Sequence, residues 1–370
     1  MMLRARILLV VILCLALLPT AGLAQRGGFS GVAQLQSPQK PRIGFMIHGG
    51  AGVITRGSMS PEREKEYRDK LEEALLAGYK ALQDGRSSLD AVEIAIRILE
   101  DSPLFNAGKG AVFTADGRIE LDSSIMDGKT LAAGAVGALH HVKNPISLAR
   151  TVMEKSPHVM MVGDGAEKFA KENNIELVDE KYFFTQPRWD SLQKILKEEK
   201  EKAAAGDKKV SSLATPESQL DVNRFGTVGA VALDSKGNIA AGTSTGGMMN
   251  KKYGRVGDSP IIGAGTYADN NTCGVSGTGH GEYFIRLGIA RDISSLMEYR
   301  GMNIQAAADM AIKQKLQKLG GDGGVIAMDK FGNMAISFNS DGMYRAYIDS
   351  KGKPVIEIYK EAEKRGVSEN

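Results

Sequence analysis

Cysteine is scarce in this chain, which has only two among its 370 residues, Cys14 and Cys273. Cys14 lies in an amino-terminal apolar run, so Cys273 alone remains for the folded part and no intramolecular disulfide is expected. A single cysteine without a supporting catalytic pattern is expected to be a small buried side chain. A disulfide scaffold is therefore excluded, and core packing must stabilise the fold.

An excess of charge of either sign is also missing. The chain has 47 Lys and Arg against 44 Asp and Glu, a net charge of +3. Arg4 and Arg6 precede the apolar run, so the remainder carries 3 − 2 = +1. This balance does not favour nucleic acid as a partner. The hydrophobic share of 42% is that of a globular protein and excludes a disordered chain.

No hydrophobic run is long enough to span a bilayer comfortably, because the longest, at 7–18, has twelve apolar residues. It follows Arg4 and Arg6 and precedes the small residues Gly22 and Ala24, the layout of a secretory signal peptide cleaved before Gln25. An uncleaved anchor is the alternative interpretation. The pattern predicts a signal peptide at 1–24 and an exported protein, periplasmic or secreted, with no stable membrane anchor.

Helices and short hairpins alternate along the rest of the chain. A polar lead-in at 25–41 precedes a buried strand at 43–47, a helix from Ser60 to about Asp84, and a second helix capped by Ser88 that ends near Leu99. Turn signals predict strand pairs within 112–121, 228–243 and 325–338, and helices are expected at 281–300 and 304–319. Such hairpins imply antiparallel sheets covered by helices, an α+β class.

A polar, charged segment at about 195–224 reads as a helix tail that runs into a mobile linker. It ends where a buried strand begins, at Gly226-Thr227-Val228. An exposed segment that leads directly into a buried strand makes this junction the most informative place in the sequence.

One motif favours a serine hydrolase. Residues 242–246 match G-x-S-x-G, which would make Ser244 a nucleophile with Asp258 and His280 as its partners. That elbow needs a helix directly after the serine, whereas 248–260 has no helical periodicity. We therefore expect His280 to be a packing or hydrogen-bonding residue.

Thr227 is the alternative nucleophile. Cleavage of the Gly226–Thr227 bond would give Thr227 a free α-amine beside its own hydroxyl, and that amine can act as general base. Glycine before the threonine allows the unusual backbone geometry that such a cleavage needs. A Gly-Thr pair alone equally fits a threonine that starts a strand.

The downstream motifs decide between these interpretations. The sequence resembles the plant-type L-asparaginase and isoaspartyl peptidase family, the N-terminal-nucleophile threonine hydrolases. The matching segments extend over nearly the whole chain from His48: HGGAG at 48–52, LFNAGKGAVFT at 104–114, ELD and SIMDG within 120–128, GTVGAVALD at 226–234, AGTSTGG at 241–247, GRVGDSPIIGAGTYAD at 254–269 and SGTGHGE at 276–282.

The resemblance implies a role for each matching residue. The nucleophile falls on Thr227, self-cleavage on the Gly226–Thr227 bond, and the threonine that assists the nucleophile on Thr245. The substrate-binding residues are Arg255 for the α-carboxylate, Asp258 for the α-ammonium, and Thr278 with Gly279, which also form the oxyanion hole. A guanidinium and a carboxylate suit these two charges.

The resemblance also implies a structural sodium ion and no cofactor for the chemistry. The ion would be held by backbone carbonyls, for which oxygen ligands are suitable. These carbonyls belong to Leu99, Glu100, Ser102, Phe105, Ala107 and Lys109. Asn106 would be oriented by the same loop, although a loop that only terminates a helix fits the sequence equally well.

The fold implied is an α+β, four-layer αββα sandwich of the N-terminal-nucleophile hydrolase type. Self-cleavage would give an α chain, 25–226, and a β chain, 227–370, within one structural domain. The expected reaction releases L-aspartate from L-asparagine or β-aspartyl dipeptides through a β-aspartyl-Thr227 ester. The expected assembly is an (αβ)2 pair of cleaved chains.

Two other functions stay open. Glycosylasparaginases share GRVGDSP, although HGGAG and Gly246-Gly247 favour the asparaginase side. A non-cleaving protein that binds acidic amino acids could keep Arg255 and Asp258, but it would need neither the Gly226–Thr227 bond nor Thr245.

Overall fold

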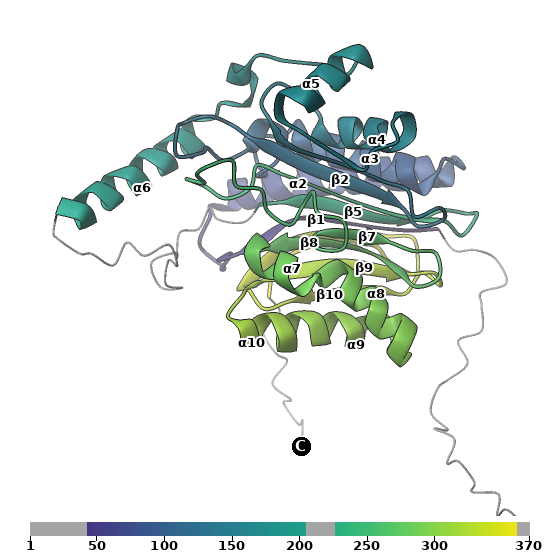
Figure 1. Ribbon diagram of the computed structural model, residues 1–370. Coiled ribbons are helices and arrows are strands. Elements are labelled where there is room, and N and C mark those ends of the chain that lie inside the picture. Colours follow the sequence, from purple (N-terminus) through teal and green to yellow (C-terminus); the bar gives the residue numbers. More distant parts are fainter. Residues whose placement is uncertain (1–42, 205–225, 361–370) are drawn as a thin grey trace, which may run out of the picture. The chain divides into compact units, whose positions relative to one another are not determined.

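Two β-sheets organise residues 43–204 and 226–360, the parts of the chain that the computed structural model describes (Figure 1). The predicted leader at 1–24, the lead-in at 25–41 and most of the linker at 195–224 lie outside these ranges. The larger sheet runs in the order β12 (Pro354–Tyr359), β11 (Gly342–Ile348), β1 (Gly44–Gly52), β5 (Val228–Leu233), β6 (Ile239–Thr245), β2 (Leu121–Asp127), β3 (Ala133–Leu139) and β4 (Met160–Val162). The smaller sheet runs in the order β10 (Met334–Phe338), β9 (Gly323–Asp329), β8 (Cys273–Gly279) and β7 (Thr266–Ala268).

Helices cover the outer face of each sheet. Those that follow β1 and β3 pack on the eight-stranded sheet, and those that follow β8 pack on the four-stranded sheet (Figure 1). The helices are α2 (Pro61–Gln83), α3 (Ser88–Glu100), α4 (Pro145–Lys155), α5 (Gly163–Glu172), α6 (Gln186–Ala204), α7 (Gly281–Leu287), α8 (Ile289–Arg300), α9 (Ile304–Asp309) and α10 (Gln317–Leu319), with short 3-10 turns η1 (Gly108–Gly110) and η2 (Glu180–Phe183).

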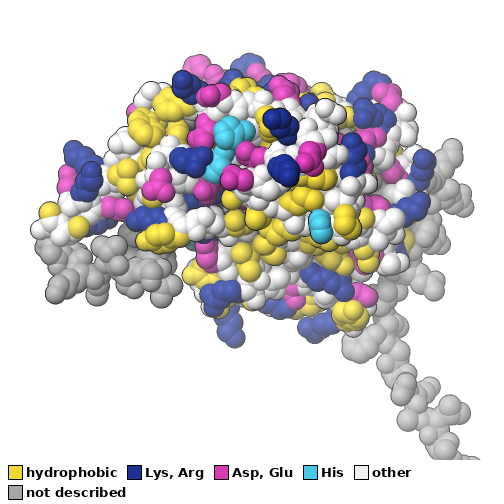
Figure 2. Space-filling view, turned by 45° about the horizontal axis from the view of Figure 1, so that its top comes forward, with side chains coloured by type: hydrophobic (Ala, Val, Ile, Leu, Met, Phe, Trp, Pro, Cys, Tyr) yellow, Lys and Arg dark blue, Asp and Glu magenta, His cyan; other side chains and the backbone are white. Residues whose placement is uncertain are grey.

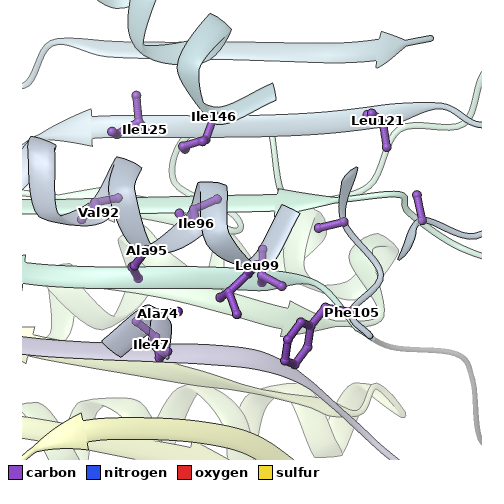
Figure 3. Close-up of a cluster of buried hydrophobic side chains, with 14 of the residues drawn as sticks. Ile47, Ala74, Val92, Ala95, Ile96, Leu99, Phe105, Leu121, Ile125 and Ile146 are labelled. Atoms are coloured by element: carbon purple, nitrogen blue, oxygen red, sulfur yellow. The ribbon is translucent and has the colours of Figure 1, made fainter. Parts of the chain in front are cut away.

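Alternate residues of the central strands face two different cores. In β1, Phe45 and Ile47 pack under α2 and α3, whereas Met46 packs against the four-stranded sheet. Figure 3 shows the first core, where Val92, Ala95, Ile96 and Leu99 of α3 meet Ile125 of β2 and Ile47 of β1. Because both faces are covered, β1 and β5 are buried along their whole length, so the strand that follows Thr227 lies deep in the protein.

The sequence prediction of antiparallel hairpins is confirmed at two of the three places. β5 pairs with β6 and β9 with β10, and all sheet pairings except β3 with β4 are antiparallel. The carboxylates of Asp234 and Asp329 each accept the backbone N–H groups two and four residues later, which closes both turns in the same way. Within 112–121 the predicted hairpin is confirmed only as a short turn, with one antiparallel bridge, Phe113 to Ile119, and a hydrogen bond from the Thr114 N–H to the Arg118 carbonyl. No strand forms there, and the next strand, β2, starts at Leu121 and pairs with β6 and β3.

Helix ends also differ in detail. Ser60 caps α2 as predicted, but α3 is capped by Ser87 and not by Ser88, because the Ser87 hydroxyl and the Asp90 carboxylate bond each other's backbone N–H groups. The helix predicted at 281–300 breaks at Gly288, whose left-handed φ of 57° ends α7 and starts α8. The helix predicted at 304–319 contains a π-helical stretch, η4 (Met310–Leu316).

Cys273 is fully buried, as its isolation in the sequence predicts. Charges of both signs are interspersed over the face in Figure 2. Within 43–204 and 226–360, no helix combines the length and the apolar character that crossing a bilayer requires.

Candidate active site

Two threonine hydroxyls meet at the ends of the central strands β5 and β6. Thr227 directly precedes β5, Thr245 ends β6, and the antiparallel register pairs Val228 with Ser244. This register puts the Oγ1 atoms of Thr227 and Thr245 3.0 Å apart. The Thr245 hydroxyl also accepts the backbone N–H of Gly247 at 3.0 Å, which holds its orientation.

Asn106 packs on the peptide bond that precedes Thr227. Its backbone N–H donates to the carbonyl oxygen of Gly226 at 3.0 Å, and its own carbonyl accepts the N–H of Gly246. Its side chain donates to the Gly247 carbonyl at 2.7 Å and accepts the Val112 N–H at 2.9 Å. A Cβ on Gly226 would lie 2.7 Å from the Asn106 Cβ, so this contact requires glycine.

A small pocket opens beside Thr227. Its lining residues are Thr227, Thr245, Gly247, Met248, Arg255, Gly257, Asp258, Ser259 and Gly279. The structure thus brings together most of the site residues predicted from sequence, from four separate segments of the chain.

Arg255 lines this pocket, and its Nη1 atom takes no part in the ion pair with Glu282. Its Nε and Nη2 donate to the two carboxylate oxygens of Glu282 at 2.8 and 2.9 Å. Burial opposes the charged form, but the bonds to Glu282 outweigh it and raise the pKa of Arg255. The bidentate pair leaves Nη1 toward Gly247 and Gly257, where it can receive a carboxylate. No role for Glu282 followed from the sequence, although it ends the motif SGTGHGE.

Asp258 is a buried carboxylate with one oxygen that no described residue satisfies. The side chain is enclosed, and Oδ2 receives no hydrogen bond within the described ranges. Burial raises the pKa of Asp258 to about 7, against the opposing effects of its own backbone N–H and of Arg255. A ligand ammonium would donate a hydrogen bond to Oδ2 and neutralise the negative charge of the carboxylate.

Thr278 and Gly279 end β8 across the pocket from Thr227. Gly279 lines the pocket, whereas Thr278 is fully buried and lies outside the lining. The Thr278 Oγ1 has no hydrogen-bond partner among the described residues. Gly279 has a φ of 156°, and a Cβ there would lie 2.5 Å from the Asp322 carbonyl, so close packing requires glycine.

The serine hydrolase constellation is not assembled. Ser244 is buried and donates to Glu100 Oε1 at 2.6 Å, outside the residues that line the pocket. Burial raises the pKa of Glu100 to about 8, against the opposing effect of the Ser244 bond. His280 lies with Nδ1 2.6 Å from Asp322 Oδ1, a carboxylate outside the predicted triad.

Two glycines of the loop between α3 and η1 pack closely on backbone carbonyls. A Cβ on Gly108 would lie 2.3 Å from the Glu100 carbonyl oxygen, and one on Gly110 would lie 2.1 Å from that of Phe105. Carbonyl oxygens are the type of ligand that suits an alkali cation. The Lys109 ammonium lies 5.2 Å from the Tyr182 ring centroid, where it faces an aromatic partner. Among the described residues, no three His, Cys, Asp or Glu side chains gather in a metal-binding group.

Comparison with known proteins identifies relatives of the whole folded part. The sequence model of the family described as asparaginase matches residues 41–358. The isoaspartyl peptidase of Salmonella typhimurium is 50% identical over 85% of this chain and 98% of its own. The plant-type L-asparaginase of Pyrococcus abyssi is 44% identical over 83% and 96%. The isoaspartyl peptidase/L-asparaginase of Rattus norvegicus is 44% identical over 80% and 84%.

The same comparison corrects the predicted location. The prediction of an exported protein, periplasmic or secreted, is wrong by these relatives. The 2% of the Salmonella protein outside the match is too short for a leader like residues 1–24, and the family match here begins at residue 41. An apolar run after two arginines resembles a leader locally, but this part of the chain lies outside the match to the family.

Proposed function

The chain belongs to the asparaginase family, and from this premise we propose that it hydrolyses β-aspartyl (isoaspartyl) peptides and L-asparagine, with release of L-aspartate. The observation that supports this most strongly is the pair of Thr227 and Thr245 hydroxyls beside a pocket that also holds Arg255 and Asp258. The substrates are small molecules or short peptides, and the chemistry uses no cofactor.

Self-cleavage is the first step of the proposal. The Thr227 hydroxyl attacks the Gly226 carbonyl carbon, whose oxygen accepts the Asn106 N–H. The C–N bond breaks, the nitrogen takes the proton, and water hydrolyses the resulting ester. The products are a chain that ends at Gly226 and a chain of residues 227–370. Pairing of β1 with β5 keeps both in one sheet, which supports a single domain after cleavage.

Hydrolysis of substrate uses the amine that cleavage releases. Arg255 holds the α-carboxylate and Asp258 the α-ammonium, which directs the side-chain carbonyl of the substrate to Thr227. The Thr227 amine accepts the hydroxyl proton and Thr245 orients the hydroxyl. The Thr278 hydroxyl and the Gly279 N–H stabilise the oxyanion. Ammonia, an amino acid or a peptide leaves with the proton, and water releases L-aspartate from the ester.

The proposal includes three structural features of the family. The fold is a four-layer αββα sandwich of the N-terminal-nucleophile type, supported by helices on the outer faces of two sheets. The backbone carbonyls of the loop from Leu99 to Lys109 hold a sodium ion, which would rigidify the segment that carries Asn106. Cleaved chains assemble as (αβ)2.

Intact-mass spectrometry and amino-terminal sequencing test this function directly. We expect two fragments, one beginning Thr-Val-Gly-Ala, that are absent from a Thr227→Ala variant, and hydrolysis of a β-aspartyl dipeptide by the cleaved protein. A single persistent chain without hydrolysis would contradict the mechanism. Preferred cleavage of glycoasparagine would instead indicate a glycosylasparaginase, and binding of aspartate without turnover a binding protein.

A further inference from the structure

A buried lysine lies next to Gly247, one of the residues that line the pocket. The side chain of Lys251 is only 1% exposed, and its ammonium lies 3.4 Å from Glu120 Oε2 and 3.9 Å from Asp122 Oδ2. It also donates to the Glu120 carbonyl at 3.3 Å. Neither the function proposed above nor the sequence motifs assign a role to this ammonium. Burial of an ammonium is costly unless it is paired and hydrogen-bonded, and Glu120 and Asp122 supply these partners here.

The ammonium lies next to the part of the pocket that receives the substrate carboxylate. A Cβ built on Gly247 would be 3.1 Å from the Lys251 Nζ and 3.6 Å from the Arg255 Nη1. Gly247 lines the pocket and is bonded through its N–H to the Thr245 hydroxyl. Two cations, Lys251 and Arg255, therefore lie close to one backbone position of the binding site.

Asp122 opposes the ammonium from the neighbouring strand. It is fully buried, stands opposite Thr245 in the pairing of β2 with β6, and its Oδ1 accepts the Ala138 N–H at 2.9 Å. Its Oδ2 receives no hydrogen bond from the described residues, so Lys251 is the cation that faces it. Burial raises the pKa of Asp122, with Lys251, Ala138 and Arg255 acting in the opposite direction.

The backbone of Lys251 is part of the loop that carries Arg255. The Lys251 carbonyl accepts the Ala115 N–H at 2.9 Å, and Asn250, directly before it, has a left-handed φ of 61°. The hydrogen bond to Ala115 fixes the Lys251 backbone between Gly247 and Arg255.

We propose that Lys251 is a positioning and specificity-determining residue, whose ammonium, opposed by Asp122, sets the positive potential where Arg255 binds the substrate α-carboxylate. The inference rests on the proposed function. Without the ammonium, the negative charges of Asp122 and Glu120 are no longer balanced and weaken the positive potential that Arg255 presents to the ligand. The affinity for ligands that lack an α-carboxylate does not depend on this change.

The test compares two competitive inhibitors, L-aspartate and β-alanine, which differ by the α-carboxylate. For Lys251→Met we expect the Ki of L-aspartate and the KM of a β-aspartyl dipeptide to rise about tenfold. The kcat, the fraction of self-cleaved chain and the Ki of β-alanine should stay within twofold. Lys251→Arg should retain most of the affinity. Lys252→Met is the matched control, because its side chain is exposed on the same loop.

The opposing carboxylate supplies a second, independent measurement. Asp122→Asn alone should lower the Ki of L-aspartate about threefold. The double variant Asp122→Asn/Lys251→Met should have a KM for the β-aspartyl dipeptide near that of the wild type. The inference is overturned if the Ki values of L-aspartate and β-alanine change equally, or if the Ki of L-aspartate is unchanged in either single variant. It is also overturned if the KM of the double variant stays as high as that of Lys251→Met. Wild-type hydrolysis of the dipeptide is measured first, so that failure of the proposed function is recognised separately.

Discussion

The backbone N–H of Asn106 donates to the carbonyl oxygen of Gly226 at 3.0 Å, which ties the peptide bond before Thr227 to a loop far away in the sequence. A hydrogen bond to this oxygen polarises the carbonyl carbon that the Thr227 hydroxyl must attack, and stabilises the charge that develops there. Because the donor is a backbone group, the side chain at 226 decides whether the two segments can approach.

Gly226→Ala is expected to slow self-cleavage at least about tenfold. The added methyl would lie 2.7 Å from the Asn106 Cβ and 2.8 Å from its nitrogen, so the two segments must separate and the hydrogen bond lengthens. A time course of intact mass measures the rate. Gly165→Ala in α5 is the control, since a Cβ there meets nothing within 4 Å. Equal rates for the two variants would show that the Asn106 contact is irrelevant to cleavage.

Thr245→Val is expected to lower kcat for a β-aspartyl dipeptide about a hundredfold with little change in KM. Valine keeps the shape but removes the hydroxyl that lies 3.0 Å from Thr227 Oγ1, so the nucleophile loses its orienting partner. Thr245→Ser, which keeps the hydroxyl, should retain most of the activity in the same steady-state assay. A larger effect on KM than on kcat would place Thr245 in substrate binding instead.

Asp258 is expected to make the folded protein less stable as the pH rises. Its pKa is raised from 3.8 to about 7 by burial, so the folded state binds its proton more tightly than the unfolded state does. Stability is therefore lost between about pH 4 and 7, by up to about 4 kcal/mol, and the loss persists above pH 7. Asp258→Asn removes this loss.

Thermal melts of the ligand-free protein test whether Asp258 lowers the stability as the pH rises. The Tm of Asp258→Asn minus that of the wild type should increase from pH 4 to pH 7.5. Saturating L-aspartate should reverse the difference at neutral pH, because its ammonium pairs with the ionised carboxylate of the wild type only. A Tm difference that does not vary with pH would mean that the carboxylate is solvated like an exposed one.

Sodium is expected to raise the Tm saturably in a buffer whose only other cation is choline. The proposed ligands are backbone carbonyls of the loop from Leu99 to Lys109, and a Cβ on Gly108 in this loop would lie 2.3 Å from the Glu100 carbonyl oxygen. Gly108→Ala should abolish the response. Gly237→Ala is the matched control, because Gly237 also has a positive φ but no neighbour within 4 Å. An unchanged sodium response in Gly108→Ala would exclude this loop as the site.

Local patterns were enough to predict a large part of this protein. Helix α2, the hairpins at Asp234 and Asp329, and the burial of Cys273 follow from periodicity, capping and turn chemistry, which act over a few residues. The family followed from motifs that keep their order along the chain. Two local patterns were less accurate. The segment 112–121 forms one antiparallel bridge and no paired strands, and the left-handed Gly288 ends a helix that the sequence pattern continues to Arg300.

The site itself depends on contacts between distant segments, which no local pattern encodes. Thr227 and Thr245 meet because of the register between β5 and β6. Asn106 reaches Gly226 because its loop directly follows α3, which packs on β5 and β6. The pairing of Arg255 with Glu282, and the burial of Lys251 beside Asp122, exist only after the chain has folded. Residue types were therefore readable in the sequence, whereas their partners, burial and charge balance come from tertiary packing, because electrostatic interactions depend on distance and solvent exclusion.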